Sequence, residues 1–203
     1  MIRNILSRAG VYSLFARIVG AERGRHLHIE RHIRPRAGDR ILDIGCGPAD
    51  ILDALPAVDY HGFDLSAPYI EAARQRFGSR GQFHVAPVNL ELVQKYAGFD
   101  LVLATGVLHH LTDTEALDLF RVARAALKPG GRLVTLDGCI VQGQSPVARY
   151  LLSQDRGEYV RGEAAYVALA RQVFSQVTPT ITTDLLRVPY THVILECREG
   201  ATP

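Results

Sequence analysis

An apolar segment that runs into a glycine turn constrains this chain more than any other feature. Residues 41–44 read as a buried strand that is interrupted only by Asp43. Gly45 and Gly47 follow, and glycine permits both positive φ angles and the close approach of a ligand to the backbone. Pro48 fits the first turn of a helix, where a missing N–H costs little. The order of strand, glycine turn and helix N-terminus predicts a ligand cradle with free N–H groups.

The acids around this turn restrict the class of ligand. A dinucleotide-binding turn would have a glycine three residues after Gly47, where this chain has Asp50. Asp43 at the strand end suits a ligand with an ammonium group and no phosphate, such as S-adenosylmethionine (SAM). Here the sequence resembles the class I SAM-dependent methyltransferases, whose first motif is an acid followed by x-Gly-x-Gly. Asp43, Gly45 and Gly47 match that motif, and Ala49 stands where the family often has a third glycine.

A second acid follows at the distance that a ribose-binding residue would need. Residues 58–64 read as the second strand, and the spacing from Gly47 to Asp64 fits the nucleotide-binding pattern. A carboxylate can accept hydrogen bonds from both ribose hydroxyls. The resemblance assigns this role to Asp64 and places Leu65 against the adenine face. The alternative is that Asp64 or Ser66 caps the helix that follows, and both roles are compatible.

Two histidines follow the expected fourth strand, at residues 99–104. Residues 105–111 resemble the family segment after that strand, which often reads Leu-His-His-Leu. The resemblance places His109 and His110 where the methyl group would point, and histidine is the natural base near neutral pH. Asp137, at the end of the fifth strand, is a further candidate base or orienting group. A structural role is weighed equally for all three, with the histidines holding the loop or the cofactor and Asp137 forming a turn.

The resemblance covers residues 36–137, about half of the chain, and implies a set of residues that hold SAM. They lie in the glycine turn and after the second, third and fourth strands. No metal is implied, because displacement at a sulfonium needs no Lewis acid and the acids and histidines lack metal-site spacing. The implied cofactor-binding residues are Asp43, Ile44, Gly45, Cys46, Gly47, Asp64, Leu65, Val88, Asn89, Thr105 and Gly106.

Strands and helices alternate as far as residue 137, which predicts parallel strands with crossover helices. The last two expected strands, 180–188 and 191–197, are joined so closely that they must form an antiparallel hairpin. At 203 residues we expect one α/β domain. Its fold class is a doubly wound, mostly parallel seven-stranded sheet of the Rossmann-like methyltransferase type. We expect three parts: a helical N-terminal lid (1–35), a SAM-binding half (36–137), and an acceptor side with the C-terminal hairpin (138–203).

The N-terminal arm is basic and has helical periodicity between residues 2 and 19. It either contacts an anionic surface or forms a lid with solvated arginines, and the lid is favoured because charge runs are usually solvated. Tyr12 and Phe15 would then line the acceptor pocket. The net charge of +2 gives no global signature of nucleic-acid binding. Three separated cysteines favour a reducing cytoplasm, and no segment is long and apolar enough to span a bilayer.

These observations predict a cytoplasmic SAM-dependent methyltransferase that releases S-adenosylhomocysteine. The expected acceptor is a small molecule, with a hydroxyl oxygen as the preferred atom, and nucleic acid is judged unlikely. Arginine and tyrosine side chains between residues 149 and 161 either bind an aromatic or anionic acceptor or pack on the surface. Two alternatives stay open: an RNA- or membrane-associated methyltransferase using the basic arm, and a SAM-binding protein that has lost methyl transfer. The sequence does not specify an oligomeric state.

Overall fold

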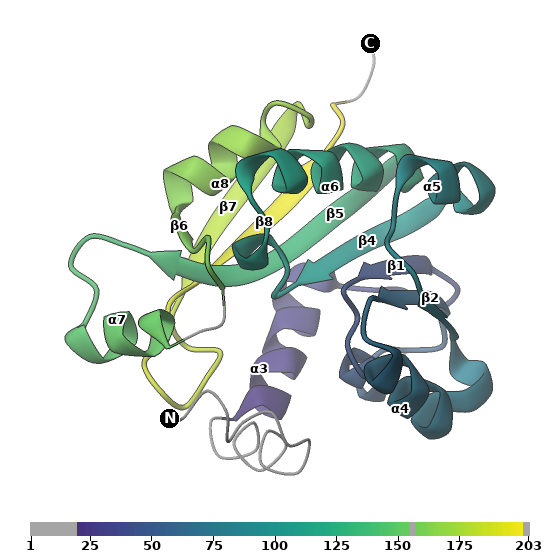
Figure 1. Cartoon of the computed structure of the whole chain (residues 1–203), viewed down its shortest axis with the longest axis horizontal. Helices are drawn as coiled ribbons and strands as arrows, with labels where there is room; N and C mark the ends of the chain where they lie inside the picture. Colours follow the sequence, from purple (N-terminus) through teal and green to yellow (C-terminus); the bar gives the residue numbers. More distant parts are fainter. Residues whose placement is uncertain (1–19, 155–156, 201–203) are drawn as a thin grey trace.

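A computed structural model describes residues 20–154 and 157–200 of the chain (Figure 1). The helix expected over residues 2–19, with Tyr12 and Phe15, lies outside the described residues. No helix in the described part is long and apolar enough to cross a membrane.

One sheet organises the described chain, with the strand order β3-β2-β1-β4-β5-β8-β7 and the two-residue β6 beside β5. Strands β1 to β5 pair in parallel, whereas β8 is antiparallel to both β5 and β7. The predicted fold class, a mostly parallel sheet with an antiparallel C-terminal strand, is confirmed. The strands are β1 Arg40–Ile44, β2 Asp59–Asp64, β3 Gln82–Val85, β4 Phe99–Thr105, β5 Leu127–Ile140, β6 Arg161–Gly162, β7 Gln176–Thr182 and β8 His192–Arg198.

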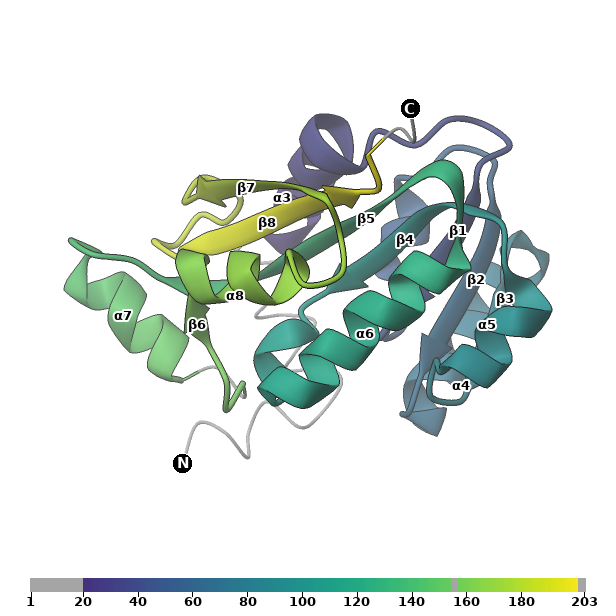
Figure 2. The ribbon, with the colours of Figure 1, turned by 90° about the horizontal axis from the view of Figure 1, so that it is seen from above.

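Helices cover both faces of this sheet (Figures 1 and 2). Alternation along β4 shows why, because Leu101 and Leu103 join one buried cluster while Val102 and Ala104 join the other. Helices α5, α6 and α8 pack on one face, and α3 and α4 lie on the other. The α-helices are α3 Ala21–His28, α4 Ala67–Phe77, α5 Leu90–Tyr96, α6 Asp113–Ala126, α7 Pro146–Ser153 and α8 Glu163–Ala170. Short turns complete the fold: the π-helical η1 Ile29–Ile33 and the 3-10 turns η2 Asp50–Asp53, η3 Gly78–Arg80 and η4 Leu108–His110.

The described part of the basic arm is attached to the C-terminal strands. From α3, Arg23 donates to the main-chain oxygen of Asp184 at 2.7 Å, and Arg31 from η1 donates to the Asp184 carboxylate at 2.7 Å. Arg34 pairs with Glu196 of β8. A Cβ on Gly24 would lie 2.6 Å from the main-chain oxygen of Leu185, so α3 packs directly on the segment between β7 and β8. These arginines therefore hold α3 and η1 in place.

The C-terminal hairpin differs from its predicted boundaries. Strand β7 covers residues 176–182 and not 180–188, so a longer loop joins it to β8. The loop begins where the Thr182 hydroxyl donates to the Asp184 carboxylate at 2.5 Å. Leu185 is buried in the cluster beneath α3 and does not continue the strand. Strand β7 therefore ends at Thr182. Beyond it, the hydrogen bond between Thr182 and Asp184 and the burial of Leu185 under α3 replace the hydrogen bonds between strands.

Candidate active site

The predicted site residues gather where the parallel strands end. Ile44 of β1 is in register with Phe63 of β2, and Thr105 of β4 is in register with Leu136 of β5. The glycine turn, Asp64, the segment after β4 and Asp137 therefore share the carboxyl edge of the sheet. Ligands of open α/β sheets bind at this edge, where the strand order reverses.

The glycine turn has a different hydrogen-bond pattern from the one expected. The N–H groups of Gly45 and Cys46 donate to the main-chain oxygen of Phe63 at 2.8 and 3.0 Å, and that of Gly47 donates to Asp64 at 2.9 Å. The prediction of free N–H groups at these positions is wrong, because the neighbouring strand accepts them. Pro48 also precedes the helix instead of starting it, since Ala49 has a φ of 55° and η2 begins at Asp50. The turn is consequently not a phosphate-binding nest.

Steric space around the two glycines nonetheless favours a ligand. A Cβ on Gly45, whose φ is 72°, would lie 2.7 Å from a methyl carbon of Val107. Gly45 thus lets the turn approach the segment after β4. Gly47 has a φ of 54°, and no heavy atom lies within 4 Å of the position of its missing Cβ. Gly47 therefore presents bare backbone to open space.

Asp43 is a buried acid with one unused oxygen. The Tyr60 hydroxyl donates to Oδ2 at 2.6 Å, while Oδ1 is buried and has no hydrogen-bond partner among the described residues. Burial, with the nearby Asp64 charge, raises the pKa of Asp43 to about 7, although the Tyr60 hydrogen bond opposes the rise. A buried acceptor without a donor is costly, so Oδ1 suits a donor brought by a ligand. Sequence reasoning missed Tyr60, which β2 places against Asp43.

The Asp64 carboxylate accepts hydrogen bonds from two turns, the glycine turn after β1 and the turn that follows β2. Its Oδ2 accepts from Gly47 and its Oδ1 accepts from the N–H of Ser66 at 2.8 Å. A carboxylate has about four acceptor sites, so capacity for two further donors is left. Ser66 occupies the N-cap position of α4, but its side chain makes no capping hydrogen bond. Leu65, beside this carboxylate, is 74% exposed and offers an apolar surface.

The remaining predicted cofactor residues divide into two groups. Asn89 caps α5, because its Oδ1 accepts from the N–H of Leu92 at 2.9 Å, and Val88 packs against the core. Thr105 is exposed at the end of β4. Gly106 has a φ of 71°, and its N–H donates to Leu136 at 2.7 Å. Thr105, at the end of β4, is therefore accessible at the carboxyl edge of the sheet. The side-chain oxygen of Asn89, by contrast, is already engaged in capping α5.

His109 and Asp137, which the sequence analysis named as separate candidates, form a buried pair. The ring Nδ1 of His109 lies 2.9 Å from Asp137 Oδ1, which also accepts the His109 main-chain N–H at 3.2 Å. His109 is 6% exposed and Asp137 is almost fully buried. Burial raises the pKa of Asp137, and its hydrogen bonds with His109 oppose that rise. With Nδ1 donating to Asp137, the ring orientation and tautomer of His109 are fixed.

A segment after α7 covers this histidine. A Cβ on Gly157 would lie 2.1 Å from Cδ2 of His109, so only glycine fits there. The Tyr159 N–H donates to the main-chain oxygen of His109 at 2.9 Å. The next residue along η4, His110, is exposed, and its ring centroid is 4.2 Å from that of His109. The structure therefore places His109 beneath the surface and His110 on it. No sequence signal identified Gly157.

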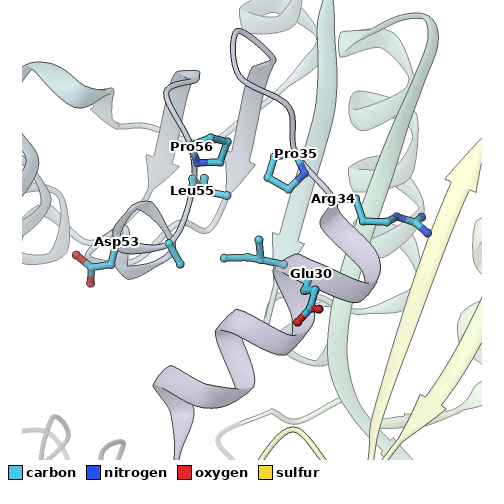
Figure 3. Close-up of a pocket in the computed structure, with 8 residues that line it drawn as sticks. Glu30, Arg34, Pro35, Asp53, Leu55 and Pro56 are labelled. Carbon is cyan, nitrogen blue, oxygen red and sulfur yellow. The ribbon is translucent and has the colours of Figure 1, made fainter.

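An open depression of about 600 Å³ lies elsewhere on the molecule (Figure 3). Its walls come from η1 and the segment that precedes β1, and from η2 and the segment that precedes β2. Pro35 and Pro56 stand on opposite sides of it, with Glu30, Arg34 and Asp53 around them. Because Pro35 and Pro56 precede the first residues of β1 and β2, this depression lies away from the carboxyl edge and its acids.

Comparison with known proteins identifies the fold and the cofactor. A family model described as a methyltransferase domain matches residues 42–133. The apo structure of the SAM-dependent methyltransferase SibL superposes with a TM-score of 0.69 and 21% identity, covering 87% of this chain and 55% of that one. Human N-acetylserotonin methyltransferase in complex with SAM has a TM-score of 0.66 and 18% identity, covering 87% and 52%. The chain belongs to the class I SAM-dependent methyltransferases. The cofactor of this methyltransferase is SAM.

Its curated relatives correct the predicted acceptor. The tRNA U34 carboxymethyltransferase of Pectobacterium carotovorum is 31% identical over 180 residues, which cover 81% of this methyltransferase and 53% of the relative. The enzyme of the same name from Geobacter sp. strain M21 is 31% identical over 156 residues, covering 68% and 44%. This methyltransferase thus spans about half the length of the curated relatives it matches. The predictions of a small-molecule acceptor with a hydroxyl oxygen, and of nucleic acid as an unlikely partner, are wrong, because these relatives are named for tRNA.

The error has a physical origin. The prediction against nucleic acid rested on a net charge of +2, which sums all charges regardless of place. Binding of a polynucleotide depends on the local arrangement of cations and aromatic side chains along its path. A nearly neutral total is therefore compatible with an RNA substrate.

Proposed function

We propose that this chain is a tRNA methyltransferase that uses SAM to modify a nucleotide of the anticodon loop. The observation that carries this proposal is the relation to tRNA U34 carboxymethyltransferases, which extends along 81% of the chain. The relation reaches beyond the cofactor half matched by the family model, which ends at residue 133. Similarity on the acceptor side is what a shared class of substrate would produce.

The cofactor site is formed by acids and bare backbone. Oδ1 of Asp43 is the acceptor for the ammonium group of SAM, and the remaining lone pairs of Asp64 accept from the ribose hydroxyls. The unpartnered Oδ1 and the open space at Gly47 support this assignment. Leu65 and Val88 border the adenine, and Thr105 and Gly106 border the methionyl part. Ile44, Cys46, Gly45 and the main chain of Asn89 complete the cradle.

The acceptor side is organised by the buried pair. When bound, SAM supplies an electrophilic methyl group, so the protein has mainly to align the acceptor and remove its proton. Asp137 holds His109 in one orientation, and His109 in turn supports the turn that presents His110. His110 is exposed at the edge and is our candidate for the group that meets the acceptor. Asp137 and His109 are then positioning residues.

The proposal is tested with purified full-length chain, SAM and total tRNA isolated from cells that lack this protein. Digestion to nucleosides and mass spectrometry should show one uridine-derived nucleoside gaining the mass of a methyl group. The Asp64→Ala variant serves as control and should modify much less tRNA than the wild type at a subsaturating SAM concentration. If SAM binds in calorimetry and no nucleoside changes mass, RNA is not the substrate.

A cytoplasmic location, expected from the cysteine pattern, agrees with a tRNA substrate and is part of this proposal. Several described arginines of the N-terminal arm are already engaged within the protein: Arg23, Arg31 and Arg34 with Asp184 and Glu196, and Arg25 with Asp50. We therefore look for the RNA-binding surface next to the acceptor edge and not on α3.

A further inference from the structure

We propose that the exposed ring of Tyr159 is the platform on which the target base of tRNA stacks beside the η4 turn. The inference rests on the proposed function and names the residue that holds the substrate. Tyr159 is one of eight large apolar side chains exposed among the described residues, with 39% of its surface accessible. A backbone hydrogen bond with His109 holds Tyr159 next to the acceptor side of the site.

Backbone contacts fix the segment around Tyr159 to the η4 turn, which contains His109. The Tyr159 N–H donates to the main-chain oxygen of His109 at 2.9 Å, and Gly157 packs on the His109 ring so closely that no side chain fits. Strand β6, which follows at Arg161, pairs with β5 at Cys139, just after Asp137. The Tyr159 segment is thus attached at both ends to the elements that carry His109 and Asp137. A side chain on such a segment has a defined place relative to the reacting groups.

Arg161 adds hydrogen bonds that join the Tyr159 segment to η4. Its guanidinium donates to the main-chain oxygens of Leu108 at 2.9 Å, Leu111 at 2.6 Å and Tyr159 at 3.0 Å. It also pairs with Asp113 at 2.7 Å, and only 9% of its side chain is exposed. The rigid fork of an arginine can bridge several oxygens in this way, which a lysine cannot. Arg161 therefore joins both sides of η4 to the Tyr159 segment as a positioning residue.

The chemistry of this surface favours a nucleobase as the ligand that stacks on the Tyr159 ring. Recognition of RNA loops commonly splays out single bases and stacks them on aromatic side chains. The Arg161 guanidinium lies 5.9 Å from the centroid of the Tyr159 ring, near the limit of a cation–π contact. Glu158 is also exposed here, so the segment offers no strong positive potential to a phosphate. Stacking on the ring, which needs no net charge, is the interaction that this surface can supply.

The chain provides a matched control in Tyr150. Its ring is 57% exposed, so it would stack on RNA as readily as Tyr159 if exposure alone mattered. In α7, Ala148 and Leu152 are buried, and Leu152 reaches Gly138 of β5. Tyr150 lies midway between them in sequence and so points to the opposite side of the helix, away from the sheet. The two residues are of the same type and Tyr150 is the more exposed, so an effect confined to Tyr159 must come from its position.

The test compares three variants of the full-length chain for binding to a fluorescent tRNA transcript with uridine at position 34, in the presence of S-adenosylhomocysteine. Tyr159→Ala should weaken binding about 5- to 150-fold, the range for loss of one base stack. Tyr159→Phe keeps the ring and should bind like the wild type, as should Tyr150→Ala. The affinity for S-adenosylhomocysteine should stay the same in all three, which shows that the cofactor half is intact.

A crosslinking experiment locates the base directly. The same transcript carries 4-thiouridine at position 34 and is irradiated in complex with the wild type, after which the crosslinked peptide is sequenced by mass spectrometry. A crosslink to the peptide with Tyr159 supports the proposal. A crosslink to α7, or an unchanged affinity in Tyr159→Ala while the wild type binds, overturns the platform and leaves the proposed function intact. If the wild type binds no tRNA at any salt concentration, the proposed function and the platform fall together.

Discussion

Replacement of Asp43 by asparagine should change how the stability of this methyltransferase depends on pH. Burial raises the pKa of Asp43 from 3.8 to about 7 in the folded protein. The unfolded chain ionises this carboxyl first, so the unfolded state gains stability as the pH rises from about 4 to about 7. At 1.36 kcal/mol for each pH unit, ionisation of Asp43 costs the native state about 4 kcal/mol above pH 7. The loss is absent below the unfolded pKa and complete above the folded one.

Asp43→Asn has the shape of the protonated acid and cannot ionise. Its side-chain oxygen can still accept from the Tyr60 hydroxyl, so the wild type and the variant should have similar stability below about pH 4. At pH 5 the wild type should already be about 1.6 kcal/mol less stable than the variant. Between pH 5 and pH 8 the wild type should lose about 2–3 kcal/mol relative to the variant. Other titrating groups are common to both proteins and cancel in the difference.

The measurement is urea unfolding followed by circular dichroism at pH 5, 6, 7 and 8, with both proteins free of cofactor. The variant should be the more stable protein at pH 8. Parallel stability profiles for the two proteins would refute the reasoning, because they would mean that Asp43 has the same pKa in the folded and unfolded states.

Three further substitutions, one of them with a matched control substitution, test the site. Asp64→Ala should weaken SAM binding in calorimetry by about 1–3 kcal/mol, the value of a charged hydrogen-bond partner, and an unchanged affinity would remove Asp64 from the site. Gly157→Ala should lower the free energy of unfolding by about 1–3 kcal/mol, because its Cβ would stand 2.1 Å from the His109 ring. Gly162→Ala, whose Cβ would meet one oxygen at 3.3 Å, should be nearly neutral, so equal losses would argue against the packing account. His110→Ala should slow transfer to tRNA in a single-turnover assay with SAM affinity unchanged, and wild-type rates would exclude a base at this position.

The parallel half of the fold could be predicted because its signals are local. An apolar run ended by a glycine turn predicted β1 to within one residue. The edge on which the site lies follows from the parallel order of the strands alone. That order places residues as distant in sequence as His109 and Asp137 at the same edge, although the hydrogen bond between them was not predicted.

Failures arose where long-range contacts decide the structure. Residues 185–188 look like a strand, but Leu185 is buried under α3, more than 150 positions away along the chain. Pro179 looks like a strand breaker, yet β7 is an edge strand, where proline is tolerated. The N–H groups of the glycine turn are taken by Phe63, an acceptor that depends on the pairing register of β2. All three features depend on which segments pair or pack in three dimensions, and the local sequence does not reveal them.

The attachment of α3 to the loop after β7 has a consequence for the order of folding. Arg23 and Arg31 meet Asp184 across 161 and 153 positions of sequence. During synthesis the chain emerges from its N-terminus, so α3 appears early and its docking partner only near the end. Contacts of such long range are slow to form and close only after the intervening sheet has assembled. Among the described elements, the first helix to be made is thus secured only late, and a nascent chain stalled before residue 184 lacks the loop on which α3 packs.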